Sequence, residues 1–73
     1  MRFAQVLNNL LSERGISAYR LSKDTGIPDS MLARWRGGDN LPSAEKLVQL
    51  ADYFQVSLDY LVGRSDDPKG GVP

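Results

Sequence analysis

Glycine residues divide this chain into short segments, and the apolar residues within each segment recur at helical spacing. In residues 2–14 the apolar positions recur at intervals of three, four, seven and eight, which places them on one face of a helix. These positions are Phe3, Val6, Leu7, Leu10 and Leu11. Gly15 follows, and glycine readily adopts the left-handed conformation that closes many helices. The pattern therefore favours a fold built from short helices.

Capping residues mark where the later helices begin. Ser17 is a good N-cap for a helix over residues 18–25, which Gly26 ends, and Pro28 bars continuation of that helix and precedes a third over 29–36. A fourth helix starts at Pro42-Ser43, and Ser57 caps a short fifth one through residues 58–62. We predict an all-α fold class with five helices and short connections.

The composition bounds the size and chemistry of the protein. Its 73 residues make a single domain, which we place at residues 1–63, with the polar residues 64–73 as a flexible tail or the start of a linker. Cysteine and histidine are both absent, so we expect no disulfide, no metal site, no cofactor and no catalytic residues. We see neither a targeting segment nor a membrane span, and expect a cytoplasmic, nucleoid-associated protein.

The charges are balanced overall but divided along the chain. Residues 1–38 carry six basic and three acidic side chains (+3), and residues 39–73 carry three basic and six acidic ones (−3). Contact with a nucleic acid depends on the local patch rather than on the net charge. A formally neutral chain can therefore present a basic side to DNA.

Residues 18–37 form the unit with the clearest functional pattern. Two short helices meet there at a tight turn, and Leu21, Ile27, Leu32 and Trp35 are spaced to pack the pair against the other helices. Such a pair leaves the outer face of its second helix free to enter a major groove about 12 Å wide. This arrangement predicts a DNA-reading helix over residues 29–36.

The stretch from Leu21 to Gly63 resembles the helix-turn-helix domain of the lambda-repressor-like, Cro/XRE family. It reads LSKDTGIPDSMLARWRGGDNLPSAEKLVQLADYFQVSLDYLVG. The resemblance covers residues 3–63 and includes the apolar spacing of the unit, Gly38, Pro42-Ser43 and the closing VSLDYL. It implies a five-helix domain that binds a double-stranded DNA operator. We expect a transcriptional regulator, a bacterial or phage repressor that acts as a homodimer on DNA, with room for a second domain after residue 73.

The resemblance also assigns roles to individual residues. The second helix would lie across the sugar–phosphate backbone, and the third would read bases, with Arg34 binding guanine O6 and N7 through two hydrogen bonds. The expected base-reading residues are Asp29, Ser30, Met31, Ala33 and Arg34. The expected backbone contacts are Ser17, Ala18, Tyr19, Arg20, Lys23, the Gly37 and Gly38 amides, and Asn40.

The chain departs from the family pattern at several of these positions. Many relatives carry Gln where Ala18 and Asp29 stand, and the loop that is often basic in them contains Asp39 here. The acidic loop and the zero net charge keep a second interpretation open, in which the same fold is an antitoxin-like or adaptor module that binds another protein. Tyr53 and Tyr60 are expected at the margin of the core or in a dimer interface.

Overall fold

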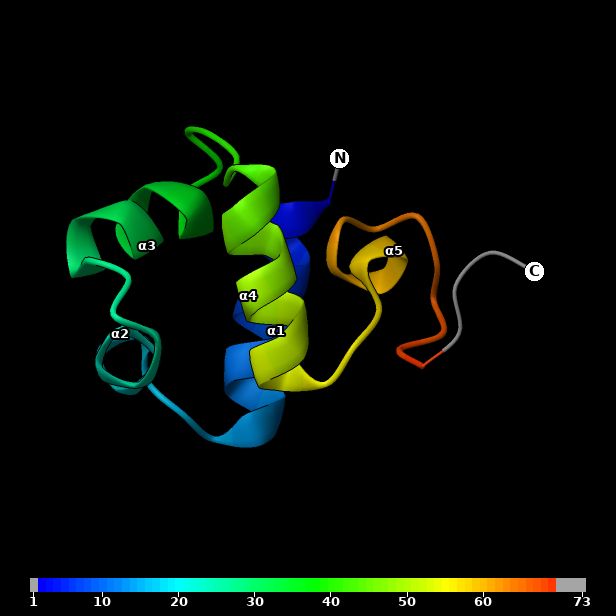
Figure 1. The fold of residues 1–73 in the computed structure, drawn as a ribbon, viewed down its shortest axis with the longest axis horizontal. Helices are drawn as coiled ribbons and strands as arrows, with labels where there is room; N and C mark the ends of the chain where they lie inside the picture. The colour runs from blue at the N-terminus through cyan, green and yellow to red at the C-terminus, as the bar shows by residue number, and fades with distance from the viewer. Residues whose placement is uncertain (1, 70–73) are drawn as a thin grey trace.

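The computed structural model describes residues 2–69, and within that range the protein is all-helical (Figure 1). The helices are α1 (Phe3–Arg14), α2 (Ala18–Thr25), α3 (Asp29–Arg36), α4 (Ala44–Phe54) and α5 (Leu58–Leu61). The predicted fold class is confirmed, with two small differences at helix ends. The first helix begins at Phe3 rather than Arg2, and the last ends at Leu61 rather than Val62.

The predicted caps are present at three helix starts. The hydroxyl groups of Ser17, Ser43 and Ser57 accept hydrogen bonds from the backbone N–H three residues further on, at distances of 3.0, 3.3 and 3.0 Å. Each bond satisfies one of the N–H groups that a helix leaves without an internal partner. Helix α3 begins differently, because its N-cap is Pro28 and no side chain caps it.

Helix α1 lies behind α4 in Figure 1, with α2 and α3 on one side of this pair and α5 on the other. Its whole apolar face is buried, as the spacing predicts. Phe3 packs edge-on against Trp35 of α3, with ring centroids 6.2 Å apart, a geometry that aromatic pairs favour. Helix α1 therefore supports both α3 and α5.

The core also contains the apolar residues predicted to join the second and third helices. Leu21, Ile27 and Leu32 are fully buried, and Trp35 is 2% exposed. Leu50, Ala51 and Phe54 of α4 are buried too, whereas Leu47, predicted in the same stripe, is only partly buried at the edge of the core. The α2–α3 pair is thus fixed to the rest of the domain by its inner face.

Residues 64–69, part of the predicted tail, run close to α5 as bends and irregular structure. The Ser57 N–H donates to the Pro68 carbonyl at 2.8 Å, and the Arg64 N–H donates to the Asp59 carbonyl at 2.7 Å. The last four residues of the predicted tail lie outside the described residues. The domain boundary at residue 63 stays a prediction.

Candidate nucleic-acid interface

Helix α3 has one buried and one exposed face. Leu32 and Trp35 point into the core, so the residues on the opposite side of the helix face solvent. The predicted base-reading residues Asp29, Ser30 and Arg34 are all exposed there, and Ala33 is exposed with them. Asp29 and Ala33 stand four residues apart, as do Ser30 and Arg34, so the four form two adjacent stripes on one surface.

The turn before α3 orients this surface. Gly26 adopts a left-handed conformation with φ of +80°, which reverses the chain after α2. The Ser22 hydroxyl donates to the Ile27 carbonyl at 2.6 Å, and the Thr25 hydroxyl donates to the Leu21 carbonyl and accepts from the Ile27 N–H. These bonds satisfy the backbone of the turn while Ile27 is buried beneath it.

Helix α4 also bonds to this turn. The side-chain amide of Gln49 donates to the Thr25 carbonyl at 2.8 Å across 24 residues of sequence. This bond joins α4 to the end of α2. The position of α3 therefore depends on α1, which packs against it, on α2, which precedes it, and on α4. Local sequence signals gave no indication of the contact.

Met31 lies apart from the other predicted base-reading residues. Its side chain is half-buried and packs against the core, and it lines a hollow with Trp35, Leu41 and Lys46 between α3 and the start of α4. A contact from Met31 to DNA would therefore come from the edge of α3 rather than from its centre.

The predicted backbone contacts at the start of α2 form a partly exposed group. Tyr19 is 63% exposed, and the Lys23 ammonium lies 5.6 Å from the centre of its ring, a cation–π contact. Ser17 is exposed and is engaged as the N-cap, whereas Ala18 is half-buried. Ser17 and Ala18 line a hollow together with Arg36, the last residue of α3.

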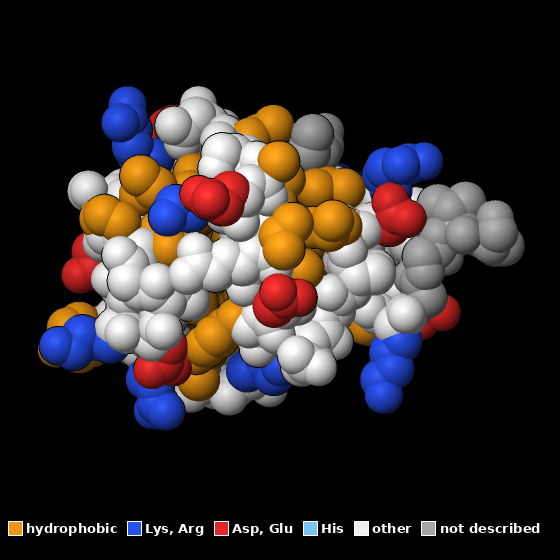
Figure 2. Space-filling model, in the orientation of Figure 1, with side chains coloured by type: hydrophobic (Ala, Val, Ile, Leu, Met, Phe, Trp, Pro, Cys, Tyr) orange, Lys and Arg blue, Asp and Glu red, His pale blue; other side chains and the backbone are white. Residues whose placement is uncertain are grey.

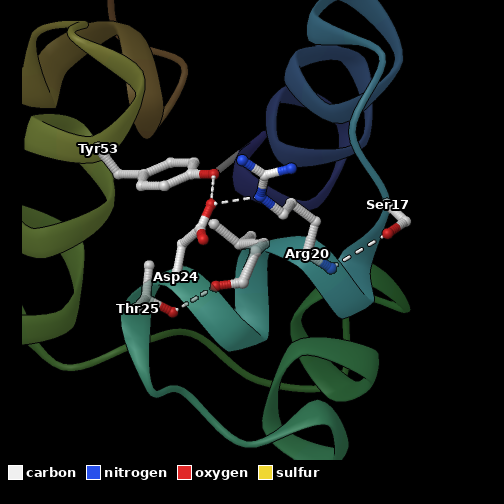
Figure 3. A network of polar contacts seen from close by, with 6 residues as sticks. Ser17, Arg20, Asp24, Thr25 and Tyr53 are labelled. Atoms are coloured by element: carbon white, nitrogen blue, oxygen red, sulfur yellow. Dashed lines mark hydrogen bonds and ion pairs between the residues drawn. The ribbon is translucent and has the colours of Figure 1, made fainter.

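Arg20 belongs to a polar network that joins α2 to α4 (Figure 3). Its Nε donates to Asp24 Oδ2 at 3.0 Å, and the Tyr53 hydroxyl donates to the same oxygen at 2.6 Å. The Tyr53 hydroxyl, and to a lesser extent Arg20, lowers the pKa of Asp24, while Asp24 raises the pKa of Tyr53. The predicted phosphate contact Arg20 thus already has an anionic partner within the protein.

The two glycine amides after α3 have hydrogen-bond partners within the helix. The Gly37 N–H donates to the Ala33 carbonyl, and the Gly38 N–H donates to the Trp35 carbonyl, at 3.0 and 3.1 Å. Both amides therefore help to end the helix, and their contact with a phosphate stays a prediction. Close approach of DNA to these exposed glycines, and to the exposed Asn40, stays a prediction.

A basic residue absent from the predicted site lies at the end of the same helix. The Arg36 Nε donates to Asn8 Oδ1 at 2.7 Å, and the Asn8 side-chain amide donates to the Arg36 carbonyl at 3.2 Å. Arg36 follows Asp29 and Ala33 at the helical spacing of seven and three residues, a signal that could have placed it on the same surface.

Comparison with known proteins identifies the family. Residues 7–61 match the family model described as "Helix-turn-helix", which covers more than half of the chain. The chain belongs to this helix-turn-helix family. The five-helix arrangement and the resemblance to Cro-type regulators agree with this assignment.

Named relatives of the chain are regulators. It is 32% identical over 66 residues to the uncharacterized HTH-type transcriptional regulator YobD of Bacillus subtilis, covering 90% of this chain and 59% of YobD. It is 28% identical over 64 residues to the cryptic phage CTXphi transcriptional repressor RstR of Vibrio cholerae, covering 88% of this chain and 57% of RstR. The chain therefore spans a little under three fifths of the length of these relatives.

A solved structure has the same fold. A transcriptional regulator from Listeria innocua superposes with a TM-score of 0.79 at 32% sequence identity, over 89% of this chain and 61% of that one. These proteins are named as regulators or repressors rather than as enzymes. Within residues 2–69, none of the helices combines the length and apolar character needed to cross a bilayer.

Proposed function

We propose that this protein binds double-stranded DNA in a sequence-specific manner and regulates transcription, with α3 in the major groove. The observation that carries the proposal is the outer surface of α3, where Asp29, Ser30, Ala33 and Arg34 are exposed while Leu32 and Trp35 hold the helix to the core. A helix of eight residues fixed in this way presents a rigid polar face of the kind that a groove accepts.

Each exposed residue of α3 has a role that fits its chemistry. The guanidinium of Arg34 donates two hydrogen bonds to guanine, and the Asp29 carboxylate accepts one from the N4 amino group of cytosine. Ser30 donates or accepts, and the Ala33 methyl group packs against a thymine methyl, with Met31 at the edge of the contact. Arg34 is the principal reader, because bidentate contacts discriminate between bases by about 1–3 kcal/mol.

The residues beside α3 position the protein on the phosphates. Lys23 and Arg20 supply charge, Ser17, Ala18 and Tyr19 stand at the start of α2, and Asn40 follows α3. Because Arg20 already binds Asp24, Lys23 is the stronger contact of the two. Contacts of this kind add affinity for every sequence and fix the register of α3.

We propose that the protein acts as a homodimer and represses by occlusion. The relative RstR is named as a transcriptional repressor, which supports the repressor part of this proposal. One recognition helix covers only a few base pairs, and a dimer places two such helices in successive major grooves about 34 Å apart. Two copies on a palindromic site would then block polymerase.

Selection of bound sites from a random duplex pool tests the proposal directly. The expected outcome is a palindromic site whose half-sites are separated by about one helical turn. The Arg34→Ala variant should then lose preference at one base position of each half-site. In contrast, Lys23→Ala should weaken binding to all sequences alike and reduce its dependence on salt.

Two outcomes would contradict the proposal. Absence of binding to any duplex in low salt would remove DNA as the partner. Equal loss on all sequences for both variants would show that Arg34 contacts the backbone and does not read a base.

Protein binding is a second candidate function, and an apolar patch over α4 and beside α5 favours it. Figure 2 shows hydrophobic side chains gathered there between acidic ones. Val48 and Leu58 are 45% and 46% exposed, and Glu45 and Asp52 lie one turn to either side of Val48 on the exposed face of α4. Sedimentation of the free protein decides whether the patch joins two copies. If it does, the wild-type protein should be a dimer and Val48→Glu a monomer. If both the wild-type protein and the variant are monomers, the patch is left to a different partner.

A further inference from the structure

Arg36 and Asn8 form a reciprocal pair between the end of α3 and the middle of α1. The two hydrogen bonds, at 2.7 and 3.2 Å, join residues 28 positions apart in the sequence. Asn8 engages only the Nε–H of Arg36, so the two terminal nitrogens of the guanidinium keep their four N–H donors. Within residues 2–69 no carboxylate forms an ion pair with Arg36, and its positive charge is exposed.

The position of this guanidinium is defined by two sets of neighbours. On α3 it continues the exposed stripe of Asp29 and Ala33 toward the end of the helix. Toward α2 it lines a hollow together with Asn8, Ser17 and Ala18. Arg36 therefore lies between the proposed base-reading surface and the proposed phosphate contacts at the start of α2.

We propose that Arg36, held in orientation by Asn8, binds a phosphate of the DNA backbone. The proposal rests on the proposed function and adds a contact to its surface. Phosphate is favoured over a base because Arg36 is the last residue of α3 and lies beside Ser17 and Ala18, two of the proposed backbone contacts. A planar guanidinium with four remaining donors matches the paired oxygens of a phosphate.

Asn8 is a positioning residue in this proposal. A free arginine side chain loses rotamer freedom when it binds, and this loss weakens the complex. The bond from Nε to Asn8 restricts the side chain before DNA arrives. The lack of charge on Asn8 matters as well, because an acidic residue in its place would neutralise the cation.

The first test compares Arg36→Met with a matched charge removal at the opposite end of the domain. Arg64, which follows α5, provides the control as Arg64→Met, because α5 and α3 lie on opposite sides of the α1–α4 pair (Figure 1). At about 0.1 M salt, screening over roughly 10 Å limits the effect of a remote charge. We expect Arg36→Met to weaken binding about tenfold per chain on every duplex, since a charged hydrogen bond is lost.

The salt dependence gives a second and independent measurement. Loss of one phosphate contact should make the negative slope of log K against log salt shallower by about 0.9 per chain. Arg36→Lys should keep most of the slope. Arg64→Met should change neither the affinity nor the slope appreciably. Thermal unfolding of each variant in the absence of DNA checks that the fold is retained.

The role of Asn8 is tested by a double-mutant cycle on binding. We expect Asn8→Ala to weaken binding about threefold when Arg36 is present and to have no effect in the Arg36→Met background. Equal losses in both backgrounds would overturn the positioning role, because Asn8 would then act through folding or through its own DNA contact.

The outcomes separate this proposal from the proposed function. If the wild-type protein binds duplex DNA and Arg36→Met binds equally well, the Arg36 contact is refuted and DNA binding stands. If Arg36→Met alters the preference at one base pair, Arg36 reads a base, which also refutes the phosphate assignment. If the wild-type protein binds no duplex, both proposals are refuted together.

Discussion

The turn between α2 and α3 and the turn between α4 and α5 share one backbone plan. In each, a residue in the left-handed conformation ends the first helix, a buried aliphatic residue follows, and the next residue occupies the N-cap position of the second helix. These residues are Gly26, Ile27 and Pro28 in the first turn, and Gln55, Val56 and Ser57 in the second. The two turns differ in what lies beyond them.

After the first turn, α3 runs for eight residues with an exposed polar face, while after the second, α5 has four residues and lies close to residues 64–69. The side-chain bonds differ as well. The side chains of Ser22 and Thr25 bond to the first turn from within it, and Gln49 of α4 bonds to it from outside. The second turn has the Gln55 side-chain bond to Asp52 and the Ser57 cap, and Arg14 of α1 donates to the Phe54 carbonyl at 2.7 Å. The same local geometry thus serves as the rigid support of a proposed binding surface in one place and closes the domain in the other.

The largest expected effect tests the two buried aliphatic residues. Ile27→Ala should destabilise the protein by about 2–5 kcal/mol, because Ile27 is fully buried and its removal leaves a cavity. Val56→Ala should cost about 2 kcal/mol or less, since it removes fewer methylene groups from a site that is 9% exposed. Urea unfolding measures both, and equal losses would contradict the greater dependence of the fold on the first turn.

The next effect tests the left-handed conformation at Gly26. An added Cβ there meets no atom within 4 Å, so Gly26→Ala is penalised only by its φ of +80°. We expect a loss of about 1–2 kcal/mol. Gly37→Ala is the matched control, because Gly37 has an ordinary φ of −85° and the added Cβ would lie 3.4 Å from the nearest atom. A similar loss at both positions would mean that the conformation is not the cause.

A smaller effect tests the polar network that joins α2 to α4. Tyr53→Phe should lower the melting temperature by less than Gly26→Ala, because it removes one exposed hydrogen bond to Asp24. Tyr60→Phe is the control, since no hydrogen bond to its hydroxyl is seen among residues 2–69.

The pH dependence of that difference follows from the two pKa shifts. Asp24 has a lowered pKa, so its contribution is present above its ordinary value of 3.8 and is lost as the pH falls through the lower folded value. Tyr53 has a raised pKa, so its contribution is present below 10.0 and is lost as the pH rises through the higher folded value. The wild-type advantage over Tyr53→Phe should shrink only beyond these two limits, and a change near neutral pH would contradict the assignment.

The smallest effect has the opposite sign. Gln55 is the one described residue other than glycine with a positive φ, at 58°. Gln55→Gly should relieve this strain and raise stability by about 0.5 kcal/mol after the loss of the Gln55 side-chain bond, or roughly 2–4 °C in melting temperature. A fall in melting temperature would show that the side-chain bond to Asp52 outweighs the strain.

Periodicity and capping predicted most of this fold, because they act within a few residues. The apolar spacing located α1 to α4 almost to the residue, and it placed Leu21, Ile27, Leu32 and Trp35 in the core. Gln55 escaped prediction because nothing in its side chain signals a left-handed conformation that its surroundings impose.

The candidate site was less predictable, because its details depend on contacts between distant residues. The spacing that buries Leu32 and Trp35 exposes Arg34, so the surface of α3 follows from the sequence. The pairing of Asn8 with Arg36 and of Asp24 with Tyr53 does not, since each joins residues more than 25 positions apart. Which exposed residues meet bases and which meet phosphates stays a prediction.

The bond from the Ser57 N–H to the Pro68 carbonyl has a practical consequence for measurements on this protein. It keeps the chain beside the start of α5 as far as Pro68, on the side of the α1–α4 pair away from α3 (Figure 1). A fluorescent dye or a surface tether attached just after Pro68, at Lys69, would therefore stand clear of the α3 surface. Fluorescence anisotropy and immobilised-protein assays can use this attachment point without placing a reporter in the expected path of the DNA.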